Sequence, residues 1–176
     1  VVLNSVVQYF PTIDYLASVL DRAVELIDDS GAVFVGDVRS FEDLELFYLD
    51  VELGRAAPLD SVDDLRSRLV QRREREAELC ISPRFFRMWA ERAGVDVEFR
   101  AKRTAARNEM SLFRYDVVVR KSCRSEAPGR AVEWSAAVPL RRTLEQFAEA
   151  VTVLGVPNPK LARVVAAAAE LPTLSS

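Results

Sequence analysis

The pattern of apolar and polar positions in the first part of the chain predicts a strand, a helix and a second strand. Val1–Val7 is β-branched and apolar on both sides, which is typical of a parallel strand covered on both faces. Pro11–Thr12 then opens a helix whose apolar residues recur at steps of three and four, and Gly31 is placed to cap its far end. Ala32–Val35 follows as a short buried strand. These elements form a βαβ unit, for which we expect a right-handed crossover.

The middle of the chain is predicted to form three helices. The first lies within Phe41–Pro58, and the second starts at Ser61, an N-cap with Asp64 in the capping-box position. The second helix is heavily charged and its arginines alternate with glutamates, which favours a solvated surface or lid helix over a binding patch. The third starts at Ser82–Pro83, as N-cap and first helical residue, and ends at Gly94.

Two further segments predict an antiparallel hairpin. Val95–Arg100 alternates with period two, and Phe113–Val119 has the composition of another strand. The residues between them, 102–112, are too few for a crossover helix, so we expect the two strands to be antiparallel neighbours. A sheet of parallel strands that finishes in an antiparallel hairpin is unusual among α/β folds.

The last third of the chain is predicted to be an extension of loops and helices. After Lys121 the composition is that of a connecting loop, and residues 131–136 fit a short edge strand. Apolar residues spaced along 144–154 indicate a helix, and Leu161–Leu171 an Ala-rich final one. We therefore assign residues 1–121 to the main part of a domain and 122–176 to its C-terminal extension.

Composition and charge exclude several kinds of chemistry. The formal net charge of −3 gives no electrostatic reason to expect nucleic acid or an acidic membrane as a partner. No apolar run approaches the roughly 20 residues that span a bilayer, so we expect a cytoplasmic protein. The chain has no histidine, which removes His-based general-base catalysis, Ser-His and Cys-His nucleophiles, and most zinc sites. Any chemistry must use carboxylates, Tyr, Arg, amides or a bound cofactor.

Polar residues gather where the two predicted parallel strands end. Asn4 and Ser5 lie at the end of the first strand, and Asp37 and Arg39 follow the second. Ligands of open α/β sheets bind at the carboxyl ends of the strands, so these residues predict a ligand site. The structural alternatives are a strand-end cap at Asn4 and Ser5 and a local ion pair between Asp37 and Arg39.

A set of segments, taken together in their order and spacing, carries a family resemblance. The segments are Leu3–Pro11 (LNSVVQYFP), Gly31–Ser40, which ends in GDVRS, Arg107–Val119 (RNEMSLFRYDVVV) and the later 155–163 (GVPNPKLAR). In combination they resemble the C-terminal part of the methyltransferase domains that are embedded in nonribosomal peptide synthetases. The resemblance implies an S-adenosylmethionine-dependent enzyme of the Rossmann-like α/β class, with helices on both faces of a seven-stranded sheet and an antiparallel last strand.

The same resemblance implies that part of the cofactor site is not in this sequence. Residues 1–7 would be the fourth strand of the sheet. The six glycines are isolated, with no Gly-x-Gly pattern for the loop that holds the amino-acid end of the cofactor. An acidic residue that ends a second strand and holds the ribose is likewise not found. We therefore expect the chain to be a fragment that is inactive by itself.

The resemblance assigns roles at the end of the first strand. Asn4 and Ser5 would lie beside the transferred methyl group and contact the cofactor. An amide or carbonyl oxygen there can accept a hydrogen bond from a substrate amine and aim its lone pair, a catalytic role for Asn4. Gln8 and Tyr9 would line the same cleft, Gln8 binding substrate and Tyr9 acting in catalysis. Asp37 would also bind substrate, as would Arg39.

The hairpin supplies the remaining candidates. Arg107 and Asn108 lie in a turn that would fold over the substrate, and Tyr115 would line the pocket. An amine must be neutral before it attacks the methyl group, and a nearby carboxylate can take or orient its proton. Without histidine, Glu109 is the best candidate base. The structural alternative is an exposed turn glutamate.

The expected function is methyl transfer, at nitrogen, to an aminoacyl thioester held on the phosphopantetheine arm of a carrier protein. The expected partners are that thioester and adjacent synthetase domains in the same polypeptide. Nitrogen is favoured over carbon because LNSVVQYFP and RNE resemble the N-methylating members. Two alternatives stay open: a degenerate methyltransferase-like scaffold without catalysis, and a free-standing small-molecule methyltransferase.

Overall fold

The computed structural model describes all residues except 58–59, 103–105, 122–129, 150 and 172–176. It divides into two compact units. The first comprises Val1–Cys123 together with Arg163–Ser176, and the second Arg124–Ala162. No described helix is long and apolar enough to cross a membrane.

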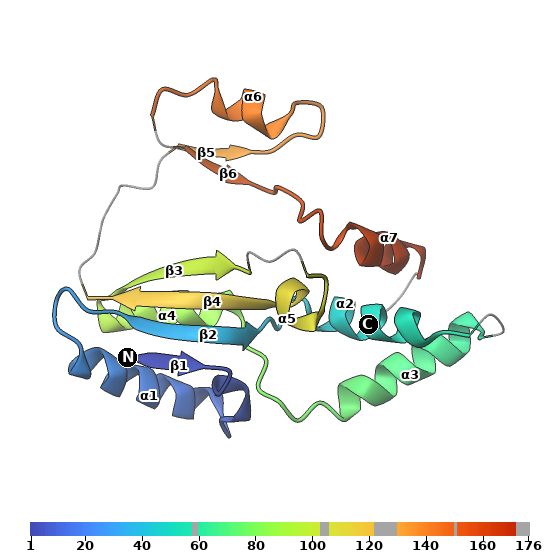
Figure 1. Ribbon diagram of the computed structural model, residues 1–176, viewed down its shortest axis with the longest axis horizontal. Coiled ribbons are helices and arrows are strands. Elements are labelled where there is room, and N and C mark those ends of the chain that lie inside the picture. The colour runs from blue at the N-terminus through green and yellow to red at the C-terminus, as the bar shows by residue number, and fades with distance from the viewer. Residues whose placement is uncertain (58–59, 103–105, 122–129, 150, 172–176) are drawn as a thin grey trace. The chain divides into compact units, whose positions relative to one another are not determined.

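The first unit contains a mixed four-stranded sheet (Figure 1). Its order is β1 (Val2–Asn4), β2 (Val33–Arg39), β4 (Arg114–Arg120) and β3 (Asp96–Ala101). β1 pairs with β2 in parallel, whereas β4 is antiparallel to both of its neighbours, β2 and β3. The last strand of this sheet is therefore the only reversed one among the four. The predicted antiparallel neighbours β3 and β4 are confirmed.

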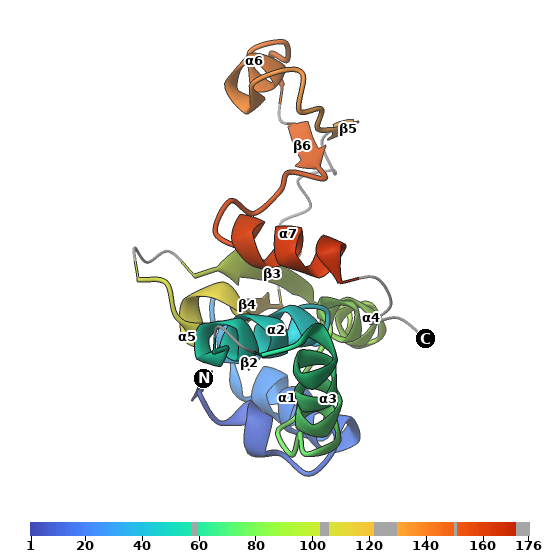
Figure 2. The same ribbon diagram turned by 90° about the vertical axis from the view of Figure 1, so that its right-hand side faces the viewer.

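Helices α1 (Ile13–Leu26) and α4 (Pro83–Ala93) share one apolar core with this sheet. Alternate residues of the central strands face them, and Phe86 of α4 is fully buried in their midst. The indole N–H of Trp89 in α4 donates to Asp21 Oδ1 of α1 at 2.8 Å, which ties the two helices together. Figure 2 shows α4 beside this sheet, and the mixed sheet with its packed helices makes the first unit an α/β fold, as predicted.

Helices α2 (Leu44–Arg55) and α3 (Val62–Glu74) form a hairpin that extends away from the end of β2 (Figure 1). Ser61 caps α3 through the predicted capping box with Asp64. The predicted caps of α4 are also confirmed, with Ser82 at its start and a left-handed Gly94 at its end. Two short helices complete the unit's connections: η1 (Val7–Tyr9) follows β1, and α5 (Glu109–Leu112) precedes β4. α7 (Ala162–Glu170) is the predicted last helix.

The second unit corrects one prediction. It pairs β5 (Arg130–Glu133) in parallel with β6 (Val151–Leu154), and it contains the short helix α6 (Leu140–Leu144). The helix predicted over 144–154 is therefore wrong, because α6 ends at Leu144 and the later residues form β6. Burial in β6 alternates along the strand, and its backbone pairs with the edge strand predicted near 131–136.

Three boundaries in the first unit also differ from prediction. β1 is shorter than Val1–Val7, and the chain turns into η1. β2 continues past Val35 through Arg39, with an irregularity in its pairing between Val35 and Val38. Gly31 does not cap α1, which ends at Leu26, and its N–H donates instead to the Asp28 carbonyl. The division of one domain at residue 122 stays a prediction.

Candidate functional site

A compact polar group lies where β1, β2 and β3 end. We call Ser5, Asp37, Lys102 and Asp116 the strand-end cluster. The ammonium of Lys102 lies 2.5 Å from Asp37 Oδ1 and 2.5 Å from Asp116 Oδ1. The Ser5 hydroxyl donates to Asp37 Oδ2 at 2.5 Å, and the Asp37 backbone N–H donates to Asp116 Oδ1 at 2.9 Å. Asp37 and Asp116 therefore bind the same lysine, and Ser5 binds Asp37.

The backbone at this cluster is held in an uncommon conformation. Ser5 has φ 55° and Asp37 has φ 60°, and in the described chain these are the non-glycine residues with positive φ. Such a conformation costs of order 1–3 kcal/mol per residue and persists only where the surroundings enforce it. The Ser5 N–H donates to the Gly36 carbonyl at 3.1 Å, and the Ser5–Asp37 bond closes the pair. The two strand ends therefore constrain each other at the carboxyl edge of β1 and β2.

The electrostatics keep a fixed cation between two carboxylates. Burial alone would raise the pKa of Asp37, but the hydrogen bonds from Lys102 and Ser5 and the charge of Lys102 hold that pKa below its usual range. Burial would lower the pKa of Lys102, yet its bonds to Asp116 and Asp37 raise it. Lys102 is thus protonated at neutral pH and cannot serve as a general base. Arg114 also lowers the pKa of Asp37 through its charge, so the two carboxylates of the cluster face more than one cation.

Asn4 lies beside this cluster in close contact with Gly36. A Cβ added at Gly36 would be 2.0 Å from Asn4 Oδ1 and 2.6 Å from a ring carbon of Phe34. The Asn4 side-chain amide also donates to the Ser5 hydroxyl at 3.2 Å. A glycine at position 36 is therefore what allows the Asn4 amide to lie against β2.

We expect Gly36→Ala to lower the free energy of unfolding by about 1–2 kcal/mol, because the Asn4 and Phe34 side chains must move. Gly54→Ala is the matched control: Gly54 lies in α2, with nothing within 4 Å of an added Cβ. It should raise stability by about 0.5–1 kcal/mol through helix propensity. Urea unfolding of both variants measures the difference, and equal shifts would show that position 36 has room.

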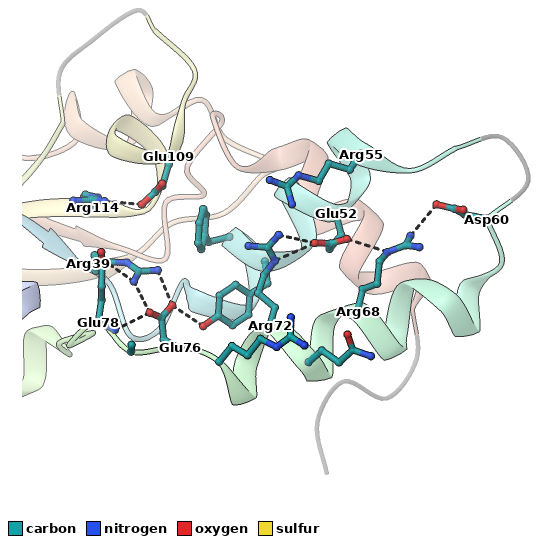
Figure 3. A pocket seen from close by; sticks show the side chains of 15 residues that line it. Arg39, Glu52, Arg55, Asp60, Arg68, Arg72, Glu76, Glu78, Glu109 and Arg114 are labelled. Carbon is teal, nitrogen blue, oxygen red and sulfur yellow. Dashed lines mark hydrogen bonds and ion pairs between the residues drawn. The ribbon is translucent and has the colours of Figure 1, made fainter.

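A pocket of about 750 Å³ lies farther along the first unit, between α2, α3 and the strand ends (Figure 3). We call it the charged pocket, because six arginines and five carboxylates line it. They are Arg39, Arg55, Arg68, Arg72, Arg75 and Arg114, with Glu52, Asp60, Glu76, Glu78 and Glu109.

Arg39 anchors the inner part of the charged pocket. Its guanidinium binds both oxygens of Glu76, at 2.8 and 2.9 Å, and Glu78 at 2.9 Å. The Tyr48 hydroxyl donates to Glu76 Oε2 at 2.8 Å. Burial would raise the pKa of Glu76, but the bonds from Arg39 hold it below its usual range. Asp37 and Arg39 thus have separate partners, so the alternative in which they pair with each other is wrong.

The candidate residues from the connection between β3 and β4 lie beside this pocket. Glu109 opens α5, and its Oε1 accepts from Arg114 Nη2 at 2.6 Å. Asn108 is the N-cap of α5, its side chain accepting from the Ser111 N–H. Arg107 lies exposed directly before that cap. Glu109 is therefore an ion-paired residue on a single helical turn, and its side chain is 39% exposed, so the alternative of an exposed turn glutamate stays open.

The remaining predicted residues lie elsewhere. Gln8 is buried in η1, and its side-chain amide donates to the Ser5 carbonyl at 3.2 Å. Tyr9 is 69% exposed. Tyr115 lies in the core against the rings of Phe86 and Phe99, and its hydroxyl donates to the Ile81 carbonyl at 2.8 Å. Burial raises the pKa of Tyr115. These surroundings give Gln8 and Tyr115 structural bonds, and their binding roles stay predictions.

The predicted residues thus separate into two adjoining places. Asn4, Ser5 and Asp37 come together at the strand-end cluster, whereas Arg39 and Glu109 line the charged pocket. The sequence reasoning missed Lys102. Its signal was the predicted hairpin, because pairing of Ala101 with Tyr115 brings the next residue of one strand toward the start of the other.

Comparison with known proteins places this chain among segments of very large synthetases. No protein-family model matches it. It is 43% identical over 121 residues, 68% of the chain, to the chondramide synthase of Chondromyces crocatus, and 39% identical over 122 residues, again 68%, to the beauvericin nonribosomal cyclodepsipeptide synthetase of Beauveria bassiana. It is 37% identical over 170 residues, 95% of the chain, to a probable nonribosomal peptide synthetase of Salinispora arenicola.

The matched segments are small parts of these relatives. They cover 3%, 4% and 2% of the chondramide, beauvericin and Salinispora proteins, respectively. The chain is homologous to short segments of nonribosomal peptide synthetases.

Proposed function

We propose that this chain is the substrate-side part of an S-adenosylmethionine-dependent methyltransferase domain embedded in a nonribosomal peptide synthetase. The observation that carries the proposal is the sheet. Its parallel strands are followed by a single reversed last strand, as the resemblance to these domains implies. The similarity to synthetase segments supports the same setting.

The composition of the strand-end cluster supports a cationic methyl donor. The cofactor would supply an electrophilic methyl group on a positively charged sulfur. The carboxylates of Asp37 and Asp116 would offer negative charge to a cation bound beside the cluster. Asn4 and Ser5, at the end of β1, would contact the cofactor. The resemblance places its glycine-rich loop and ribose-binding carboxylate upstream.

The proposed substrate is the amine of an aminoacyl thioester on a carrier protein. In the transfer a nitrogen–carbon bond forms, the sulfur–carbon bond breaks, and the amine loses one proton. Asn4 would accept a hydrogen bond from the amine and so aim its lone pair. Glu109 would take the proton: its Oε1 is held by Arg114, and among the described residues Oε2 has no hydrogen-bond partner.

The test is calorimetric titration of S-adenosylhomocysteine into two proteins. One is this chain, and the other is extended upstream by about 200 residues, the size of the remaining half with some margin. We expect binding to the extended protein only. Binding to the 176-residue chain would overturn the part of the proposal in which upstream residues complete the cofactor site. Binding to neither protein would overturn methyl transfer and favour the alternative of a methyltransferase-like scaffold without catalysis.

A further inference from the structure

The charged pocket contains more positive than negative charge, and the excess is concentrated at identifiable residues. All five carboxylates are used in ion pairs: Arg39 binds Glu76 and Glu78, Arg68 binds Glu52 and Asp60, Arg72 also binds Glu52, and Arg114 binds Glu109. Arg55 and Arg75 have no such pair within the described part of the chain. Both are exposed, so an anion can reach them without the cost of burying a bare charge.

The two unpaired arginines are not needed to end their helices. At the end of α3 the backbone N–H of Arg75 donates to the carbonyls of Gln71, Arg72 and Arg73. The Arg75 guanidinium is therefore not needed to cap this helix. Arg55 is the last residue of α2, and its guanidinium makes no hydrogen bond to another described residue. Figure 3 shows Arg55 with no interaction drawn, beside the network of Glu52, Arg68 and Arg72.

The pocket is elongated along α2. Its inner part is lined by Arg39, Arg114 and Glu109 at the strand ends, and its outer part by Arg68 and Asp60, while the Arg55 side chain points back from the end of α2 toward Arg72 (Figure 3). α2 starts just after β2, and its 12 residues span about 18 Å. The backbone of Arg55 therefore lies far from the strand ends, and its guanidinium lies over the middle part of a groove whose wall also includes Phe47.

We infer that the charged pocket binds the phosphopantetheine arm of the carrier protein, with Arg55 holding the phosphate. This inference rests on the proposed function, which places the reacting end of the arm at the strand ends. The arm is long, carries its anion at one end and has amides along its length. A groove with polar walls, and with a guanidinium away from the strand ends that has no ion pair among the described residues, can hold such an arm. A guanidinium binds a phosphate with charge-assisted hydrogen bonds.

The experiment compares phosphopantetheine with pantetheine, which lacks the phosphate, by titration into the 176-residue chain. We expect phosphopantetheine to bind at least about tenfold more tightly than pantetheine, as one charge-assisted contact allows. Arg55→Gln should reduce the affinity for phosphopantetheine to that for pantetheine. Arg84→Gln is the matched control, because Arg84 is an exposed residue of α4 outside the pocket and its loss changes net charge equally.

Several results would overturn the inference. They are equal affinities for the two ligands, no binding of phosphopantetheine, or equal effects of Arg55→Gln and Arg84→Gln. Inorganic phosphate distinguishes a site for the free anion: if it binds as tightly as phosphopantetheine, the pocket does not recognise the arm. Because none of these titrations uses the cofactor, the outcome is separate from that with S-adenosylhomocysteine. Cofactor binding without arm binding would overturn only this inference.

Discussion

Lys102→Met should lower the free energy of unfolding by about 3 kcal/mol at pH 7. The substitution removes the ammonium that lies 2.5 Å from both Asp37 and Asp116 and leaves two carboxylates facing each other. The side chains of these aspartates are only 10% and 16% exposed, so water cannot fully replace the lost cation. The strained backbone at Ser5 and Asp37 would also lose part of what enforces it.

The loss of stability in Lys102→Met should become smaller as the pH is lowered. In the native protein the pKa of Asp37 is lowered, so its stabilising contribution is present above the unfolded value of about 3.9 and is lost as the pH falls through the folded pKa. In the variant the cation that lowers the pKa of Asp37 is gone, so Asp37 takes up a proton at a higher pH than in the native protein, and the repulsion between the two carboxylates is relieved. The deficit should therefore shrink as the pH is lowered from about 7 to about 4.

The measurement is urea unfolding at both pH values, followed by the fluorescence of Trp89 in a Trp134→Phe background. Trp89 lies in the core of the first unit, so it reports on the unit that contains Lys102. Lys102→Arg keeps the positive charge and should retain most of the stability. A deficit that does not change with pH would show that lost packing is the cause, which contradicts the electrostatic account.

Local sequence signals predicted the helices well. The capping box at Ser61 and Asp64, the Ser82–Pro83 start and the Gly94 end all act within a few residues, so neighbouring sequence determines them. Boundaries that depend on distant partners were less predictable. β2 extends to Arg39 because β4 pairs with it beyond the irregularity, a contact made by residues about 75 positions later.

The second unit shows how a helical pattern can mislead. The apolar spacing that includes Leu144 and Val151 fits one face of a helix, yet Val151–Leu154 pairs as a strand with Arg130–Glu133. Four-residue segments carry too few positions to separate a period of 3.6 from a period of two. Pairing with Arg130–Glu133 therefore determines that Val151–Leu154 is a strand.

The candidate site was predictable where it depends on strand ends and not where it depends on register. Asn4, Ser5 and Asp37 were expected at the carboxyl edge, and the structure brings them together there. Lys102 was missed because its role follows from pairing between β3 and β4, which also places Asp116 beside it. Charged residues in a loop give no such information before the register is known.

Glu52→Ala should lower the free energy of opening of the α2–α3 hairpin by about 3 kcal/mol. The Glu52 side chain is 6% exposed, and it accepts from Arg68 Nε at 3.0 Å and from Arg72 Nε and Nη2 at 3.0 and 2.8 Å. Alanine would leave Arg72 without its carboxylate partner and would open a hole between the two helices. The arginines can rehydrate, since they are 35% and 27% exposed, so we place the loss at the lower end of that for buried pairs.

Hydrogen exchange tests both the size and the place of this loss. Protection should fall in Leu44–Arg55 and Val62–Glu74, whereas amides of Arg114–Arg120 that exchange through openings in which the hairpin stays closed should keep their protection, because the sheet has its own core. Glu45→Ala is the control: Glu45 joins the same two helices through Arg73, but that pair is 3.5 Å long and exposed, so its removal should cost about 0.5 kcal/mol or less. If the two variants lose protection equally, the hairpin is held by apolar contacts and not by the buried carboxylate. If protection falls in Arg114–Arg120 as well, the hairpin and the sheet unfold as one, and the charged pocket is part of the stable core.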